Sequence, residues 1–196
     1  MNPFDMTLFH WFNSLAGRNH VLDVVTSAIT QYAPFVFIGL FAIYFLMDPA
    51  ETSRMRRSVL LAGLSGVLAV LLSVVIGSLV YRARPFLFLP PEQVHLLIPH
   101  SPESSFPSDH AAGSAAFAFG MWRSPDRSAR WVFSVTALLV GVSRLVAGVH
   151  WPTDILASFA LGGLSAQVIF ALDRPLSPLL TWVLRLFERA QRRFRR

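Results

Sequence analysis

The sequence contains no cysteine and no lysine, and only 14% of its 196 residues are charged. Without cysteine, disulfide bonds and thiolate chemistry are excluded, and cysteine usage cannot report the redox state of the compartment. All 17 basic residues are arginines, so the net charge of +6 comes from arginine alone. In an ordinary soluble domain about a quarter of the residues are charged. A chain that is 54% hydrophobic and this poor in charge is unusual for a soluble protein.

Three windows contain no Asp, Glu, Arg or His at all: Val24–Met47, Ser58–Tyr81 and Ile155–Leu172. About 20 helical residues cross the hydrocarbon core of a bilayer, so each window is long enough to span it. One such run could be a buried helix of a soluble protein, but three indicate a multi-pass membrane protein. Two further runs contain some polar residues. We therefore predict an all-α bundle of about five spans, roughly 24–47, 58–80, 107–122, 131–149 and 153–172.

The N-terminal residues 3–17 have a different pattern. Large apolar side chains recur there at steps of three and four residues: Phe4, Leu8, Trp11, Phe12 and Leu15. This spacing is typical of an amphipathic helix that lies in the membrane interface, and we expect Gly17 to end it. No internal repeat divides the chain, so we expect residues 1–196 to form one integral-membrane domain.

Arginines gather in three regions, 54–57, 123–130 and the tail 173–196. Five spans place all three regions on one side of the membrane, which the positive-inside rule makes cytoplasmic. The tail ends in the cluster Arg192, Arg193, Arg195 and Arg196. Next to a membrane span, this cluster is better interpreted as an anchor at anionic lipid than as a nucleic-acid-binding segment.

The opposite side receives a long loop, 81–106, and two polar clusters. The loop begins with "YRARPF", in which Arg82 and Arg84 break the charge rule. After the loop comes "FPSDHA", where Ser108 is a candidate helix N-cap followed by Asp109 and His110. Free N–H groups at a helix start favour an anion. Taken alone, the two arginines fit side chains that extend from a helix end to the membrane interface, and Ser108 fits an ordinary helix cap.

The third cluster is "SRLVAGVHWPTD" at 143–154. It places Arg144 inside a predicted span, where a charge costs about 2.5–3.5 kcal/mol. His150 comes four residues before Asp154, so the two can share a helix face. A carboxylate beside an imidazole can hold one ring nitrogen as a donor and leave the other free as a nucleophile. Because all three clusters fall on one side, we predict a site there.

The residue types restrict the ligand of this site. Two histidines and two aspartates form a possible metal set, but Arg84 and Arg144 would repel a divalent cation. Guanidinium groups match oxyanions in geometry and charge. A phosphate-type anion is therefore favoured, with metal as the minor alternative.

These residues resemble a known family. "RPF" at 84–86, "PSDH" at 107–110 and "SRLVAGVHWPTD" at 143–154 are similar to the three motifs of the type-2 phosphatidic acid phosphatase superfamily. The wider stretch 94–113 looks like that of the bacitracin-resistance (BcrC-type) undecaprenyl-diphosphatases. These have Asp where most of the superfamily has Gly, here Asp109.

The resemblance implies roles for individual residues and implies no metal and no cofactor. His150 would attack phosphorus and form a phosphohistidine, supported by Asp154. His110 would protonate the leaving oxygen and then help to activate water. The phosphate would be held by Arg84, Ser108 and Arg144, with Asp109 and Arg82 as further candidates for the substrate site.

One departure from the family pattern concerns Arg82. The superfamily usually has a lysine seven residues before the arginine of its first motif, and that position here is Gly77. Either Arg82 supplies the missing charge, or phosphate binding does without it. We also expect Arg82 or Arg84 to pair with Asp109. His95, His100 and Glu103 have no assigned role.

The implied activity is hydrolysis of undecaprenyl diphosphate to undecaprenyl phosphate in the bacterial inner membrane. The substrate would reach a periplasmic site from the bilayer, and the activity would give bacitracin resistance. The nearest alternative is a broader lipid phosphatase acting on phosphatidylglycerophosphate, phosphatidate or other prenyl diphosphates. Vanadate-dependent haloperoxidases share the motifs, but they are soluble. A catalytically silent membrane protein is disfavoured by the complete set of His110, His150 and Asp154.

Overall fold

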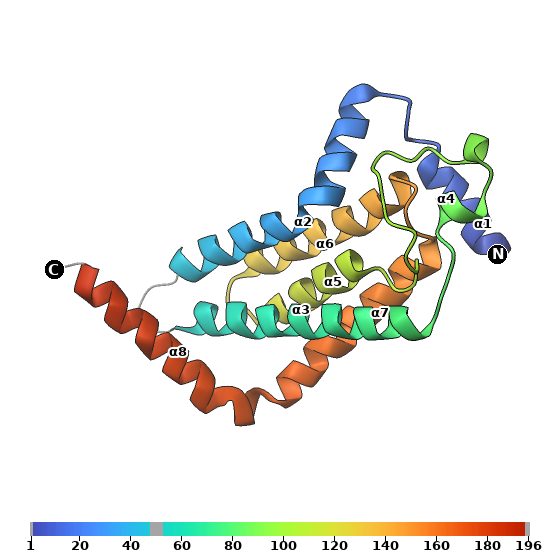
Figure 1. The fold of residues 1–196 in the computed structure, drawn as a ribbon. Helices are drawn as coiled ribbons and strands as arrows, with labels where there is room; N and C mark the ends of the chain where they lie inside the picture. The colour runs from blue at the N-terminus through green and yellow to red at the C-terminus, as the bar shows by residue number, and fades with distance from the viewer. Residues whose placement is uncertain (1, 48–52, 195–196) are drawn as a thin grey trace.

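A computed structural model describes residues 2–47 and 53–194, which form helices and no β-strand. In chain order the helices are α1 (Pro3–Asn13), α2 (His20–Met47), α3 (Arg54–Leu79), α4 (Pro85–Phe88), the 3-10 turn η1 (Pro91–Gln93), α5 (Asp109–Met121), α6 (Arg127–Val146), α7 (Pro152–Ala171) and α8 (Asp173–Phe194). α3, α5, α6 and α7 form a bundle, α2 packs along α6, and α8 leaves at an angle (Figure 1). The predicted all-α class is confirmed.

Four helices of the described chain are long and apolar enough to cross a membrane: α2, α3, α6 and α7. The predicted count of about five spans is not confirmed, because the expected span 107–122 corresponds to α5, which has only 13 residues. Such a helix is about 20 Å long, shorter than the hydrocarbon core of about 30 Å. α5 instead lies within the bundle, and most of its side chains are buried against neighbouring helices.

Small residues allow α3, α5 and α7 to approach closely. A Cβ added to Gly162 of α7 would lie 2.6 Å from both the carbonyl oxygen of Ala112 and the backbone nitrogen of Ala116 in α5. A Cβ on Gly120 of α5 would lie 2.5 Å from the Cα of Ala62 in α3. Backbone therefore packs directly on backbone at both crossings, as is common between membrane helices.

Helix α2 bends along its length (Figure 1), and Pro34 lies inside it. Proline has no N–H, so the carbonyl of Thr30 loses its normal partner four residues on, and the ring pushes that turn apart. The freed Thr30 carbonyl faces α6, where it accepts a bond from Arg144 at 3.4 Å.

The two terminal helices pack at opposite ends of the bundle. In α1, Phe9 is buried against Trp151 with ring centroids 5.1 Å apart, while Trp11 is exposed. The helix ends at Asn13, and Gly17 closes the following turn with a φ of 77°; its predicted place in the membrane interface stays a prediction. α8 is attached to the start of α3 by Arg57–Asp173 and Ser53–Glu188 bonds. The predicted arginine cluster falls outside the described residues at Arg195 and Arg196, and outside the described side chains at Arg192 and Arg193.

Candidate active site

The three polar clusters meet at one end of the bundle. There α3 and α6 end and α5 and α7 begin, and the 80–108 segment folds over them (Figure 1). Arg84 of the first cluster reaches His150 of the third, Ser105 just before the second cluster reaches Asp154, and Arg84 and Asp109 line the same pocket. The sequence thus predicted residues that the fold brings together.

His150 lies in the link between α6 and α7 and is 1% exposed. Its Nδ1 is 2.8 Å from the carbonyl oxygen of Ser105, and its Nε2 is 3.1 Å from Arg84 Nη1 and 3.3 Å from Arg144 Nη2. Guanidinium nitrogens only donate hydrogen bonds, so Nε2 must be the unprotonated nitrogen. Nδ1 therefore carries the proton and donates it to the Ser105 carbonyl.

Burial lowers the pKa of His150 to about 4, and the positive charges of Arg144 and Arg84 act in the same direction against the opposing effect of Asp154. A buried imidazole resists protonation because its cation would lose hydration. His150 is consequently neutral at physiological pH, with an Nε2 lone pair directed at two cationic groups. This is the state that a nitrogen nucleophile requires.

Asp154 supports His150 less directly than the spacing predicted. Asp154 Oδ2 is 3.8 Å from His150 Nδ1, beyond hydrogen-bond distance. The hydroxyl of Ser105 lies between them, donating to Asp154 Oδ2 at 2.5 Å and lying 3.4 Å from Nδ1. Asp154 Oδ2 also accepts the Trp151 N–H at 2.9 Å at the start of α7. Ser105 was missed because a single loop serine has no periodic signal.

Arg84 is 5% exposed and is held by backbone carbonyls. Its Nε donates to Glu103 O at 3.1 Å, and its Nη1 donates to Val149 O at 3.0 Å. The long loop and the α6–α7 link therefore both position this guanidinium. In the described part of the chain, its third hydrogen-bond contact is the one with His150 Nε2.

Arg144 is 1% exposed and lies in the last turn of α6, nearer the helix end than the predicted span placed it. Its Nη1 uses the Thr30 carbonyl freed by Pro34, and its Nη2 lies 2.9 Å from His100 Nε2. Burial and the charges of Arg84 and Arg144 lower the pKa of His100 to about 4, so His100 accepts this bond as a neutral ring. The Nε of Arg144 is buried without a hydrogen-bond partner in the described part of the chain.

The two buried guanidiniums converge on a neutral ring rather than on an acid. Within residues 2–47 and 53–194, neither Arg84 nor Arg144 has a carboxylate oxygen within 4.0 Å. Burying a guanidinium without an acidic partner costs free energy. The arrangement suits an anion with several oxygens in front of His150 Nε2, where it would receive hydrogen bonds from both forks.

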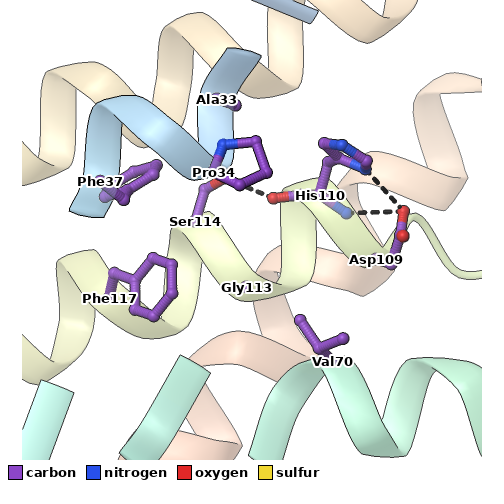
Figure 2. Close-up of a pocket in the computed structure, with 9 residues that line it drawn as sticks. All are labelled: Ala33, Pro34, Phe37, Val70, Asp109, His110, Gly113, Ser114 and Phe117. Atoms are coloured by element: carbon purple, nitrogen blue, oxygen red, sulfur yellow. Dashed lines mark hydrogen bonds and ion pairs between the residues drawn. The ribbon is translucent and has the colours of Figure 1, made fainter. Parts of the chain in front are cut away.

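The start of α5 contributes Ser108, Asp109 and His110. Ser108 is the predicted N-cap, accepting the Ala111 N–H at 3.4 Å, and its own N–H donates to Ser158 at 2.8 Å. Asp109 Oδ1 accepts from the backbone N–H of His110 at 2.8 Å and lies 2.9 Å from His110 Nδ1 (Figure 2). Asp109 thereby fixes Nδ1 as the donor and leaves His110 Nε2 available.

Within residues 2–47 and 53–194, the expected ion pair of Asp109 with Arg82 or Arg84 is not observed. His110 is its ion-pair partner, and Arg84 is used by backbone carbonyls and His150. Arg82 donates to both Asp5 and Asp154 at 2.5 Å. These contacts place Arg82 on the side of Asp154, so its predicted contact with phosphate stays a prediction.

Two pockets adjoin at Asp109. The polar one, of about 470 Å³, has Arg84, His100 and Glu103 in its wall, together with Gly77, where the family pattern has lysine. The second, of about 270 Å³, is lined mainly by apolar side chains from α2, α3 and α5 (Figure 2), and His110 and Asp109 lie at its edge: Ala33, Pro34, Phe37, Val70, Asp109, His110, Gly113, Ser114 and Phe117. A polar pocket and an apolar pocket thus share Asp109 as a wall.

Known proteins are similar to this chain over nearly its whole length. Undecaprenyl-diphosphatase BcrC of Bacillus subtilis (strain 168) is 30% identical over 181 residues, which cover 92% of this chain and 90% of BcrC. The bacitracin transport permease protein BcrC of Bacillus licheniformis is 33% identical, covering 98% of this chain and 91% of that protein.

Solved structures share the fold. The crystal structure of Aquifex aeolicus LpxE has a TM-score of 0.72 at 22% identity, covering 87% of this chain and 96% of LpxE. A transmembrane PAP2-type phosphatidylglycerolphosphate phosphatase from Bacillus subtilis has a TM-score of 0.60 at 23% identity, covering 89% of each chain.

The family profile described as the PAP2 superfamily matches residues 58–176, which include the ends of all four helices that build the site. The chain therefore belongs to the PAP2 superfamily and is a membrane phosphatase.

Proposed function

We propose that this protein hydrolyses undecaprenyl diphosphate to undecaprenyl phosphate and phosphate through a phosphohistidine on His150. The observation that carries the proposal is a neutral buried imidazole whose Nε2 faces two guanidiniums, at 3.1 and 3.3 Å. A nucleophile and a site for phosphate oxygens therefore occupy the same place. Two relatives with substantial coverage bear the name undecaprenyl-diphosphatase.

The chemistry follows from the proton positions. His150 Nε2 attacks the terminal phosphorus, and the bond to the bridging oxygen breaks while Arg84 and Arg144 bind the charge on the phosphoryl oxygens. Protonated His110 gives its Nε2 proton to the leaving oxygen. His150 retains its Nδ1 proton, and Ser105 and Asp154 stabilise the positive charge that develops on the ring. A water deprotonated by His110 then attacks the phosphohistidine and releases phosphate.

The two adjoining pockets support a lipid substrate. We place the diphosphate in the polar chamber with Arg84 and the first isoprenoid units in the apolar one with Phe37, Val70 and Phe117. His110 lies at the edge of the apolar pocket, where the phosphate and lipid portions of the substrate would join. The substrate would enter from the bilayer between α2, α3 and α5.

The arginine distribution supports an orientation. Arginine-rich turns lie at the bundle end opposite His150. The arginine-rich end would therefore be cytoplasmic, and the site would be periplasmic. On that face the enzyme would recycle the cell-wall carrier lipid. Recycling would also confer tolerance to bacitracin, which sequesters the diphosphate form.

The test is phosphate release by purified protein in detergent with EDTA. We expect kcat/KM for undecaprenyl diphosphate to exceed that for phosphatidylglycerophosphate, and His150→Gln to be inactive on both. A preference for phosphatidylglycerophosphate would favour the broader lipid phosphatase, and an active His150→Gln would refute the mechanism.

A second variant tests the lipid pocket. Val70→Phe would fill the apolar chamber, because Val70 is one of its walls. We expect KM for undecaprenyl diphosphate to rise, while hydrolysis of inorganic diphosphate, which has no isoprenoid unit, is unchanged. Equal changes in KM for both substrates would show that the lipid tail does not bind in this pocket.

A further inference from the structure

A second acidic residue is buried close to Asp154, and it comes from the N-terminal helix. Asp5 is 0% exposed in the first turn of α1 and lies outside the segment 58–176 that matches the family. Its carboxylate accepts from the Thr153 N–H at 2.9 Å, the Thr153 hydroxyl at 2.7 Å and the Asn2 amide at 3.1 Å. Burial would raise the pKa of Asp5, but the bonds from Thr153 and Arg82 outweigh it and lower the pKa.

Arg82 connects Asp5 to the catalytic group. One guanidinium nitrogen donates to Asp5 Oδ2 at 2.5 Å, and the other donates to Asp154 Oδ1 at 2.5 Å and to Thr153 Oγ1 at 2.7 Å. Asp154 in turn accepts the Ser105 hydroxyl, which lies beside His150 Nδ1. A continuous chain of polar contacts therefore extends from α1 to the proposed nucleophile.

We propose that Asp5 is a positioning residue, which shares the charge of Arg82 and so keeps a net negative charge behind His150. This rests on the proposed function, because it takes His150 as the nucleophile. Two buried carboxylates share one guanidinium, so Asp5, Arg82 and Asp154 together carry a net charge of −1.

The charge matters because of what lies on the other face of the ring. Arg84 and Arg144 oppose positive charge on His150, yet the ring becomes cationic when Nε2 bonds to phosphorus. If Arg82 were neutralised by Asp154 alone, the group behind the ring would be neutral. Asp5 restores one negative charge on the far side of Arg82, and charges in a poorly hydrated interior interact more strongly than in water.

A purely mechanical role for α1 is separable from this one. Asn13, at the other end of α1, donates to the carbonyls of His95 and Val146 at 2.8 and 2.9 Å and accepts the His95 N–H at 2.8 Å. It anchors α1 to the bundle without contacting Asp154. Asn13→Ala is therefore the matched control for loss of anchoring.

The test is a double-mutant cycle on the full-length enzyme in isolated membranes and in detergent, using undecaprenyl diphosphate. Asp5→Asn makes the trio neutral, and we expect kcat to fall about tenfold to a hundredfold with KM little changed. Arg82→Gln removes the cation that holds Asp5 and Asp154 together, and we expect kcat to fall because the two buried carboxylates then repel each other and Asp154 is displaced. Asp5→Asn/Arg82→Gln returns the trio to −1, so the double variant should be more active than either single variant. Asn13→Ala should lower Tm and retain kcat.

Each other outcome has a distinct meaning. Wild-type kcat in Asp5→Asn would overturn the inference. A double variant that is no more active than the more active single variant would reduce Asp5 to a structural anchor and also overturn the inference. His150→Gln, measured in parallel, must be inactive; if it is active, the proposed function has failed rather than the role of Asp5.

Discussion

The two ends of the helical bundle accommodate buried arginine in different ways. At the end where α8 packs near α3, the guanidinium of Arg56 lies 5.7 and 5.0 Å from the ring centroids of Phe45 and Phe187. Its neighbour Arg57 forms a 2.7 Å ion pair with Asp173. Charge at this end is compensated by acids and aromatic faces, which fits a structural role.

At the other end, Arg84 and Arg144 are buried against a neutral His150 and backbone carbonyls. Of the acidic groups nearby, Asp5 and Asp154 are bonded to Arg82, and Asp109 is bonded to His110. Positive charge is thus left in front of the ring and negative charge behind it. The difference teaches that buried arginine is paired with acids or aromatic rings at the end with a structural role, and lacks an acidic partner at the end where we propose that an anion binds.

The largest effect should come from removing one uncompensated guanidinium. We expect Arg144→Met to lower kcat/KM about a hundredfold to a thousandfold, as loss of one transition-state donor does. The Tm should be unchanged or higher, because a desolvated charge without a carboxylate partner is removed. Kinetics and thermal unfolding of the purified variant check both expectations. Near-normal activity would show that Arg144 does not bind the phosphate.

The pH dependence of the free energy of unfolding tests the difference between the two ends at His150. Its folded pKa of about 4 lies below the ordinary 6.5, so its contribution to stability is present above pH 6.5 and is lost as the pH falls toward 4. For a buried ring this amounts to about 3 kcal/mol. Denaturant unfolding at pH 7 and at pH 4.5 should therefore differ less in His150→Gln than in wild type. Identical pH dependence in the two proteins would contradict a buried neutral His150.

A smaller effect on stability is expected at the crossing of α5 and α7, which lies between the two ends of the bundle. Gly162→Ala places a Cβ 2.6 Å from backbone atoms of α5, and such overpacking costs about 1–3 kcal/mol. Gly63→Ala is the matched control, because its Cβ would meet nothing within 4 Å. Thermal unfolding should show a lower Tm for Gly162→Ala and no decrease for Gly63→Ala. Equal Tm values would mean that α5 and α7 are less closely packed than described.

The smallest effect should come from the compensated end. Asp173→Asn breaks an ion pair whose side chains are 29% and 32% exposed, and such pairs contribute about 0–1 kcal/mol. We expect a slight loss of stability that shrinks with added salt, and unchanged hydrolysis of undecaprenyl diphosphate. A large loss of activity would show that the two ends are coupled.

Much of the site was predictable because its signals are local. Runs without charge indicate membrane helices, and the spacing of Arg144, His150 and Asp154 places them at one helix end and the next helix start. The convergence of Arg84 on His150 followed from a topology based on arginine counts, and the contacts confirm that convergence.

The remaining features depend on contacts between distant segments. Asp5 is 77 residues from Arg82 in sequence, and Ser105 is 45 residues from His150. No periodicity relates such pairs, so neither the charge sharing by Arg82 nor the serine between His150 and Asp154 was foreseen. The predicted count of about five spans is not confirmed, because α5 has only 13 residues and its apolar side chains are buried in the bundle.

The most direct test of the account is to trap the covalent intermediate. The enzyme is mixed with undecaprenyl diphosphate radiolabelled in its terminal phosphate and denatured within one turnover. We predict label on His150 that is stable in base and lost in acid, as a phosphoramidate is. Product formation without labelled His150, or equal labelling of His150→Gln, would contradict the central claim that this buried neutral histidine is the nucleophile.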